Sequence, residues 1–156
     1  MTTKLRPETF ARDVVRLDQF WPYQVTVLAD RIARRTTRIV KQRGLNLSQW
    51  RVLAAIAEGP GRTSAEVVSM TPMDKGIVSR ATKALLALGS IRREASQLDG
   101  RLSHLHLTDA GMQLYRELIV EVQAVTGLEA AGLSPARQQE LNTDLKSLIA
   151  LLPDLR

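Results

Sequence analysis

The 156-residue sequence contains no cysteine and only two histidines. The absence of cysteine excludes disulfides, thiolate metal sites and redox sensing by cysteine. His104 and His106 lie two residues apart on an expected strand and therefore share one face, but two ligands are too few for a tetrahedral metal site. We therefore expect no bound metal, and we place both histidines on an exposed strand face near phosphate.

The sequence also lacks the motifs of common enzymes and membrane proteins. It has no glycine-rich phosphate loop, and no serine stands in a nucleophile elbow or with a placed base. No apolar run approaches the ~20 residues that a membrane span needs, and the first residues show no apolar signal region. We expect a cytoplasmic protein that has no catalytic activity and needs no cofactor.

Positive charge is plentiful and unevenly distributed. The formal net charge is +6 and the pI is near 10.3, which indicates attraction to polyanions. Residues 24–47 hold six Lys or Arg against one acid, and residues 72–101 hold six against three. Residues 102–156 hold four against seven acids, so the basic excess lies in the first two thirds of the chain.

Two consecutive helices are expected between residues 63 and 88. Thr63 and Glu66 form a capping box for a short helix that ends before Thr71. Thr71 is expected to cap a second helix, Pro72–Leu88, whose apolar residues recur at helical spacing. Its opposite face would carry Lys75, Gly76, Ser79, Arg80, Thr82 and Lys83. In a helix-turn-helix the second helix enters the major groove, so the candidate DNA contacts on this face are Lys75, Gly76, Ser79, Arg80 and Lys83.

Two extended runs, Ile91–Ser96 and Leu102–Leu107, follow Gly89, which is expected to end the second helix. The Asp-Gly pair between the runs favours a hairpin turn that places Arg101 near its tip. A basic helix face alone is more often a solvated surface, but the order of helix, helix and hairpin favours DNA binding. We add Arg93 and Arg101 to the candidate DNA contacts.

Helices are also expected on both sides of this core. One runs from Gln24 to Arg43, and Ser48 is expected to cap the next. Another begins at Asp109 after Thr108, and Ser134 with Pro135 opens the last. The last helix carries an apolar stripe that needs a partner surface, and a second subunit is the simplest partner. The stripe consists of Leu141, Leu145, Leu148, Ile149 and Leu152.

The expected fold is mainly α, with a winged helix-turn-helix core, a small β-hairpin wing and long flanking helices. Residues 1–47 would form an N-terminal arm and the first dimerisation helix. Residues 48–108 would form the DNA-binding core, and residues 109–156 the C-terminal dimerisation helices.

Four of the six aromatic residues lie near the start of the chain, at Phe10, Phe20, Trp21 and Tyr23. We favour an arm that packs on the core or on a partner subunit, with Phe20 in the dimer interface. The alternative is a flat pocket for an aromatic ligand, for which the candidates are Trp21, Tyr23, Arg31 and Trp50. For Trp50 itself, a place in the core is favoured.

Four segments carry a resemblance to a known family: Met73–Arg80, Gly89–Arg93, Asp99–Arg101 and Leu107–Gly111. With these segments, the region from Ser48 to about Leu118 resembles the MarR family of bacterial transcriptional regulators. It implies that the first and last long helices form a dimer interface, that Asp99 pairs with Arg80 to brace the wing, and that Arg101 enters the minor groove. The family usually has two basic residues after the wing aspartate, whereas this chain has Gly100 before Arg101.

We therefore expect a homodimeric transcriptional regulator that binds a roughly palindromic site in double-stranded DNA. The resemblance further implies a repressor that responds to a small aromatic or anionic effector, bound between the dimerisation and DNA-binding parts. Two alternatives stay open: a ligand-independent architectural DNA-binding protein, and a protein-interaction module with the winged fold. Binding that is steeply salt-dependent and sequence-selective favours the regulator, whereas loss of selectivity favours the architectural protein.

Overall fold

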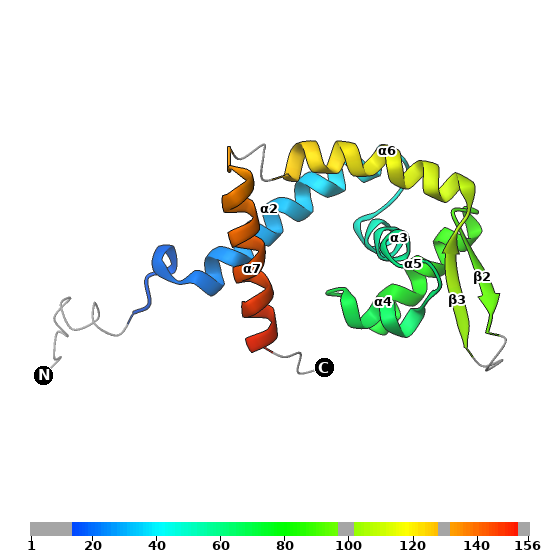
Figure 1. The fold of residues 1–156 in the computed structure, drawn as a ribbon, viewed down its shortest axis with the longest axis horizontal. Coiled ribbons are helices and arrows are strands. Elements are labelled where there is room, and N and C mark those ends of the chain that lie inside the picture. The colour runs from blue at the N-terminus through cyan, green and yellow to red at the C-terminus, as the bar shows by residue number, and fades with distance from the viewer. Residues whose placement is uncertain (1–13, 97–101, 128–131, 153–156) are drawn as a thin grey trace, which may run out of the picture. The chain divides into compact units, whose positions relative to one another are not determined.

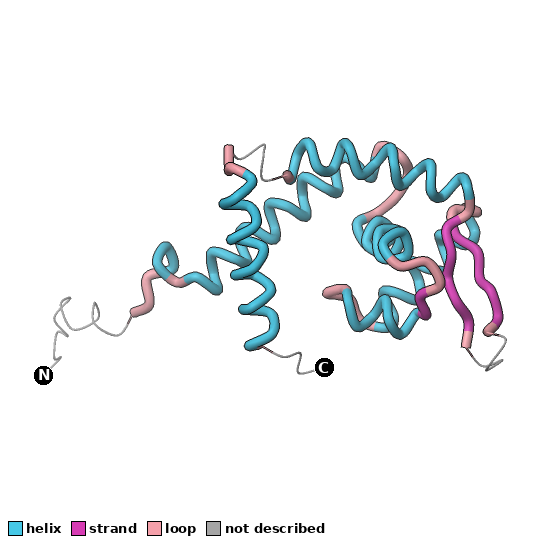
Figure 2. Tube along the Cα trace, in the orientation of Figure 1, coloured by secondary structure: helices cyan, strands magenta, loops and turns pink. Residues whose placement is uncertain are grey.

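Six α-helices and a three-stranded antiparallel sheet are present in the part of the chain that the computed structural model describes, residues 14–96, 102–127 and 132–152 (Figures 1 and 2). The fold is mainly α, and its helices and the two strands of the hairpin follow one another in the predicted order. Two compact units can be distinguished, residues 1–34 and residues 35–156. No helix in these described ranges is long and apolar enough to cross a membrane.

The first unit holds the 3₁₀ turn η1 (Leu17–Gln19) and most of helix α2 (Trp21–Lys41). The predicted start of α2 at Gln24 was wrong by three residues, because Pro22 is accommodated in the first turn, where a helix tolerates proline. Residues 14–16, which precede η1, are not helical.

The winged core contains helices α3 (Leu47–Glu58), α4 (Ser64–Met70) and α5 (Lys75–Ala87). The predicted capping box of α4 is confirmed, since the Thr63 side chain accepts from the Glu66 N–H and the Glu66 carboxylate accepts from the Thr63 N–H. The predicted end of α4 before Thr71 is confirmed as well.

The other two predicted caps in this core were wrong. Helix α3 begins after Asn46, not Ser48, because the Asn46 side chain accepts from the Gln49 N–H at 2.9 Å. Helix α5 begins after Asp74, whose Oδ1 accepts from the Ile77 N–H at 2.7 Å. Thr71 instead follows α4, where its hydroxyl donates to the Val67 carbonyl at 2.7 Å. In both cases an Asx carboxylate or amide, a strong cap acceptor, takes the place assigned to a hydroxyl.

The sheet has the strand order β1-β3-β2; β1 precedes α4, and β2 and β3 follow α5 after a tight turn. Strands β2 (Ile91–Ala95) and β3 (Ser103–Leu107) confirm the two predicted runs, with Arg93 opposite Leu105 in the register. Strand β1 (Arg62–Thr63) was not predicted, because two residues are too few to show an alternating pattern. Gly89 adopts a φ of +67° and ends α5 as expected.

The hydrophobic core lies between α3, α5, β3 and helix α6 (Asp109–Thr126). Its most deeply buried members come from all four elements: Leu53, Ile56, Val78, Leu85, Leu105 and Leu118. Trp50 is 6% exposed and stacks on Tyr115 with ring centroids 5.7 Å apart, which confirms its place in the core. Thr108 caps α6 as predicted.

Helix α7 (Pro135–Leu151) begins after Ser134 with proline in its first turn, as predicted. It contains no buried residue. Within its apolar stripe Leu145 is 36% exposed, Ile149 72% and Leu152 62%. The stripe therefore remains available to a partner surface, and its place in a dimer interface remains a prediction.

Candidate nucleic-acid interface

Helix α5 presents a polar face to solvent. Five predicted DNA-contacting residues are exposed along it: Lys75, Gly76, Ser79, Arg80 and Lys83. Two expectations for this helix were wrong. Thr82 is 1% exposed, because it lies one turn after Val78 and one turn before Leu85 on the core side. Leu88 is 58% exposed, because it follows the last helical residue and leaves the packed face.

Three cations on α5 and β2 have no ion-pair partner among the residues that the structure describes. Within the described ranges no carboxylate forms a salt bridge with Lys75, Lys83 or Arg93. On β2 it is Arg92 that pairs with Glu94, at 3.0 Å, while Arg93 points to the opposite side of the strand. These positive charges are therefore available to an external anion such as a phosphate.

A cavity of about 340 Å³ opens between α4, α5 and β2. We call it the α4–α5 notch; it is lined by Ser64, Ala65, Val68, Lys75, Val78, Ser79, Thr82 and Arg93. It brings together three predicted DNA-contacting residues, Lys75, Ser79 and Arg93. The contribution of α4 was not predicted, because it depends on how two helices pack. The spacing of residues 75, 78, 79 and 82 does mark a single stripe of one helix.

The two histidines lie on the outer face of the sheet, and each has a polar partner. His104 Nδ1 lies 2.7 Å from the Gly61 carbonyl oxygen, and His106 Nε2 lies 3.1 Å from Glu94 Oε2. Both are half-buried, which corrects the expectation that they are exposed. No cluster of three or more metal-ligating side chains occurs among the residues that the structure describes.

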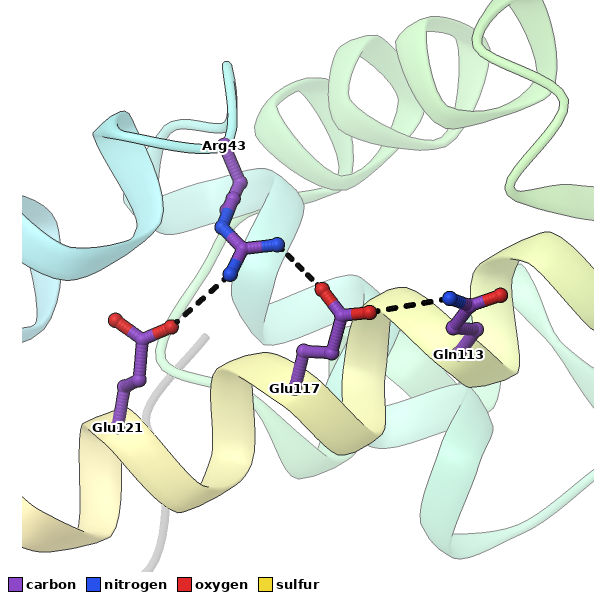
Figure 3. A network of polar contacts seen from close by, with 4 residues as sticks. All are labelled: Arg43, Gln113, Glu117 and Glu121. Carbon is purple, nitrogen blue, oxygen red and sulfur yellow. Dashed lines mark hydrogen bonds and ion pairs between the residues drawn. The ribbon is translucent and has the colours of Figure 1, made fainter.

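A polar network connects the turn after α2 to the middle of α6 (Figure 3). The Arg43 guanidinium donates to Glu117 and, at 3.2 Å, to Glu121, while the Gln113 amide donates to Glu117 at 3.1 Å. The pKa of Glu117 is lowered, first by the hydrogen bond from Gln113 and then by the hydrogen bond and charge of Arg43. The pKa of Arg43 is raised, chiefly by its hydrogen bond to Glu117. This network was not predicted, because its partners lie far apart in the sequence.

Several predicted site residues lie elsewhere. Asp99 and Arg101 are outside the described residues, so the wing brace to Arg80 and the minor-groove contact stay predictions. In the first unit, Tyr23 and Arg31 line a cavity of about 270 Å³. The other pocket and interface candidates there, Trp21 and Phe20, are 47% and 42% exposed and do not line it.

A helix-turn-helix whose second helix exposes a basic face, followed directly by a β-hairpin, defines a winged helix-turn-helix protein. Residues 43–102 match the model of the MarR family, and this segment spans α3, α4, α5 and β2. The winged core of this chain is therefore similar to that of MarR-family transcriptional regulators.

Known relatives agree with this assignment. The chain is 31% identical over 81 residues to the HTH-type transcriptional regulator PetP of Rhodobacter capsulatus, covering 52% of this chain and about half, 49%, of that protein. It is 26% identical to the HTH-type transcriptional repressor IacR of Pseudomonas putida, over 87% of this chain and 81% of that protein. A MarR-family regulator from Silicibacter pomeroyi has the same fold, with a TM-score of 0.79 at 24% identity, over 88% of this chain and 93% of that one.

Proposed function

We propose that this protein is a sequence-specific repressor that binds a roughly palindromic operator in double-stranded DNA as a homodimer. The observation that carries the proposal is the surface formed by α5 and β2. There Lys75, Ser79 and Arg93 surround one notch, and neither cation has a carboxylate partner within the described ranges. Unpaired cations on a recognition helix suit phosphates and base edges of the major groove.

The homodimer is supported by apolar surface at both ends of the chain. Helix α7 buries none of its residues, although Leu148, Ile149 and their neighbours form an apolar stripe. Residues 14–34 also expose large apolar side chains, among them Phe20 and Leu28. A small protein seldom leaves apolar surfaces of this kind exposed to water. A two-fold dimer would cover both surfaces in both subunits.

Repression and its relief by a small effector complete the proposal. The name of IacR, a repressor similar to this chain over most of its length, supports the sign of regulation. The cavity beside Tyr23 and Arg31 supports an effector with an aromatic ring and an anionic group. The phenol ring of Tyr23 would contact the aromatic ring, and the guanidinium of Arg31 would bind the anionic group. Such a ligand would lower operator affinity by favouring a dimer with unsuitable half-site spacing.

Selection of bound sequences from a random duplex pool tests the proposal. The regulator predicts enrichment of one two-fold symmetric sequence, with affinity for it well above that for a scrambled duplex at the same salt concentration. Salt-dependent binding without enrichment would instead indicate an architectural protein. No binding at low salt would indicate a protein-interaction module.

A further inference from the structure

The α4–α5 notch has a polar group at its floor that the fold does not use. Thr82 is 1% exposed, and no group in the described ranges hydrogen-bonds its Oγ1. Buried hydroxyls in folded proteins almost always have a partner, and one without a partner costs free energy that valine, with the same shape, would avoid. A threonine at this position therefore requires an explanation outside the packing of the core.

Thr82 lines the notch together with residues of the DNA-facing surface of α5. Lys75 and Ser79 are exposed at its mouth, whereas Val78 and Thr82 are buried at its floor. Arg93 reaches the same space from β2. A volume of about 340 Å³ accommodates several water molecules, because each occupies about 30 Å³ of liquid. Hydroxyl and guanidinium groups around such a space are suitable partners for ordered water.

We propose that Thr82 is a specificity-determining residue that acts on DNA through water held in the α4–α5 notch. The inference rests on the proposed function, in which α5 enters the major groove. Thr82 Oγ1 and the Ser79 hydroxyl orient the water, and the water forms a hydrogen bond with a base edge beside Ser79. Ordered waters that bridge side chains to bases can carry sequence specificity. Since Thr82 is uncharged, it should affect which bases the protein prefers and should not affect the salt-dependent attraction to phosphates.

The test compares Thr82→Val, which keeps the shape and removes the hydroxyl, with Thr82→Ser, which keeps the hydroxyl. Each variant is measured by selection from a random duplex pool, by affinity for the selected and the scrambled duplex over a salt series, and by thermal melting. For Thr82→Val we expect roughly fivefold to tenfold weaker binding to the selected duplex, relaxed selection at one or two neighbouring bases, and little change on the scrambled duplex.

The other readouts separate this role from a structural one. Thr82→Val should melt at the wild-type temperature or above it, because no internal hydrogen bond is lost, and the salt slope should not change. Thr82→Ser should restore the wild-type selection. The matched control is Thr71→Val, since the buried Thr71 hydroxyl donates to the Val67 carbonyl at 2.7 Å. This control should melt at a lower temperature and keep the wild-type selection.

Three results would overturn the inference while leaving the regulator intact: wild-type selectivity in Thr82→Val, equal losses on both duplexes, or a Thr82→Ser variant that behaves like Thr82→Val. A Thr82→Val protein that melts as low as Thr71→Val would show that the hydroxyl has a partner inside the fold, which also contradicts the inference. Wild-type protein that shows no sequence preference would overturn the proposed function itself.

Discussion

At the scale of single residues, the sequence is most informative where the determining contacts are local. The capping box of Thr63 and Glu66, the proline that opens α7 and the stop at Gly89 each depend on neighbours within four residues, and all three predictions are confirmed. The start of α5 was mislocated because Thr71 and Asp74 are both competent caps, and only packing decides between them. The burial of Thr82 likewise depends on how α4 and β2 pack around α5.

Gly111 provides a test at this scale. A Cβ atom at this position would lie 1.8 Å from the Ser90 carbonyl oxygen, which itself accepts the Thr108 N–H at 3.1 Å. Gly111→Ala must therefore move the start of α6 away from β2, and we expect it to lower the free energy of unfolding by about 1–3 kcal/mol despite alanine's better helix propensity. Denaturant titration measures this change. Ala110→Ser, an exposed change in the same turn, is the control, and equal stability of both variants would contradict the close packing.

At the scale of elements, hydrophobic periodicity located the helices and both long strands, including α7, which buries none of its residues in the single chain. It could not locate β1, which is too short, or the network by which Arg43 connects the turn after α2 to α6 (Figure 3). The residues of this network are ordinary exposed charges in the sequence. Their pairing depends on a helix that begins more than sixty residues further along the chain.

Arg43→Gln tests the network through its pH dependence. The lowered pKa of Glu117 is due first to Gln113 and second to Arg43, so the stability that the arginine contributes through Glu117 is present only while Glu117 is ionised. That contribution is present above the ordinary pKa of 4.5 and is lost as the pH falls through the lower pKa of the folded state.

We therefore expect the difference in unfolding free energy between wild type and Arg43→Gln to be largest near neutral pH and to shrink under acid or high salt. Denaturant titrations at a series of pH values measure it. Arg137→Gln, which removes a pair with Glu140 inside one helix, is the control and should change stability less. A difference that stays constant through the titration of Glu117 would exclude this role of Arg43.

At the scale of the whole molecule, the resemblance in the winged core supplied the family, and the residues on its exposed helix face supplied the candidate contacts. Composition alone established only a basic protein attracted to polyanions. The dimer was inferred from an apolar stripe on α7, a helix that buries none of its residues in the single chain.

Replacing both Leu145 and Leu148 by aspartate tests the dimer. Two charges in an apolar interface would lose hydration without gaining partners, so we expect monomers or insoluble protein. Sedimentation velocity distinguishes monomer from dimer. Gln139→Glu adds a charge to an exposed position on the other side of the same helix and should leave assembly unchanged. A soluble, intact dimer of the double variant would exclude this stripe from the interface.

The central claim is that the exposed face of α5 selects bases, and the most direct test is the affinity of Lys75→Ala and Ser79→Ala for the selected and the scrambled duplex at one salt concentration. If both side chains contact bases, each variant should lose about 1–3 kcal/mol of binding free energy on the selected duplex and much less on the scrambled one. Lys146→Ala, an exposed lysine on α7, is the control and should bind both duplexes as the wild type does. Equal losses on the two duplexes for both variants would contradict base selection by this face and favour an architectural protein.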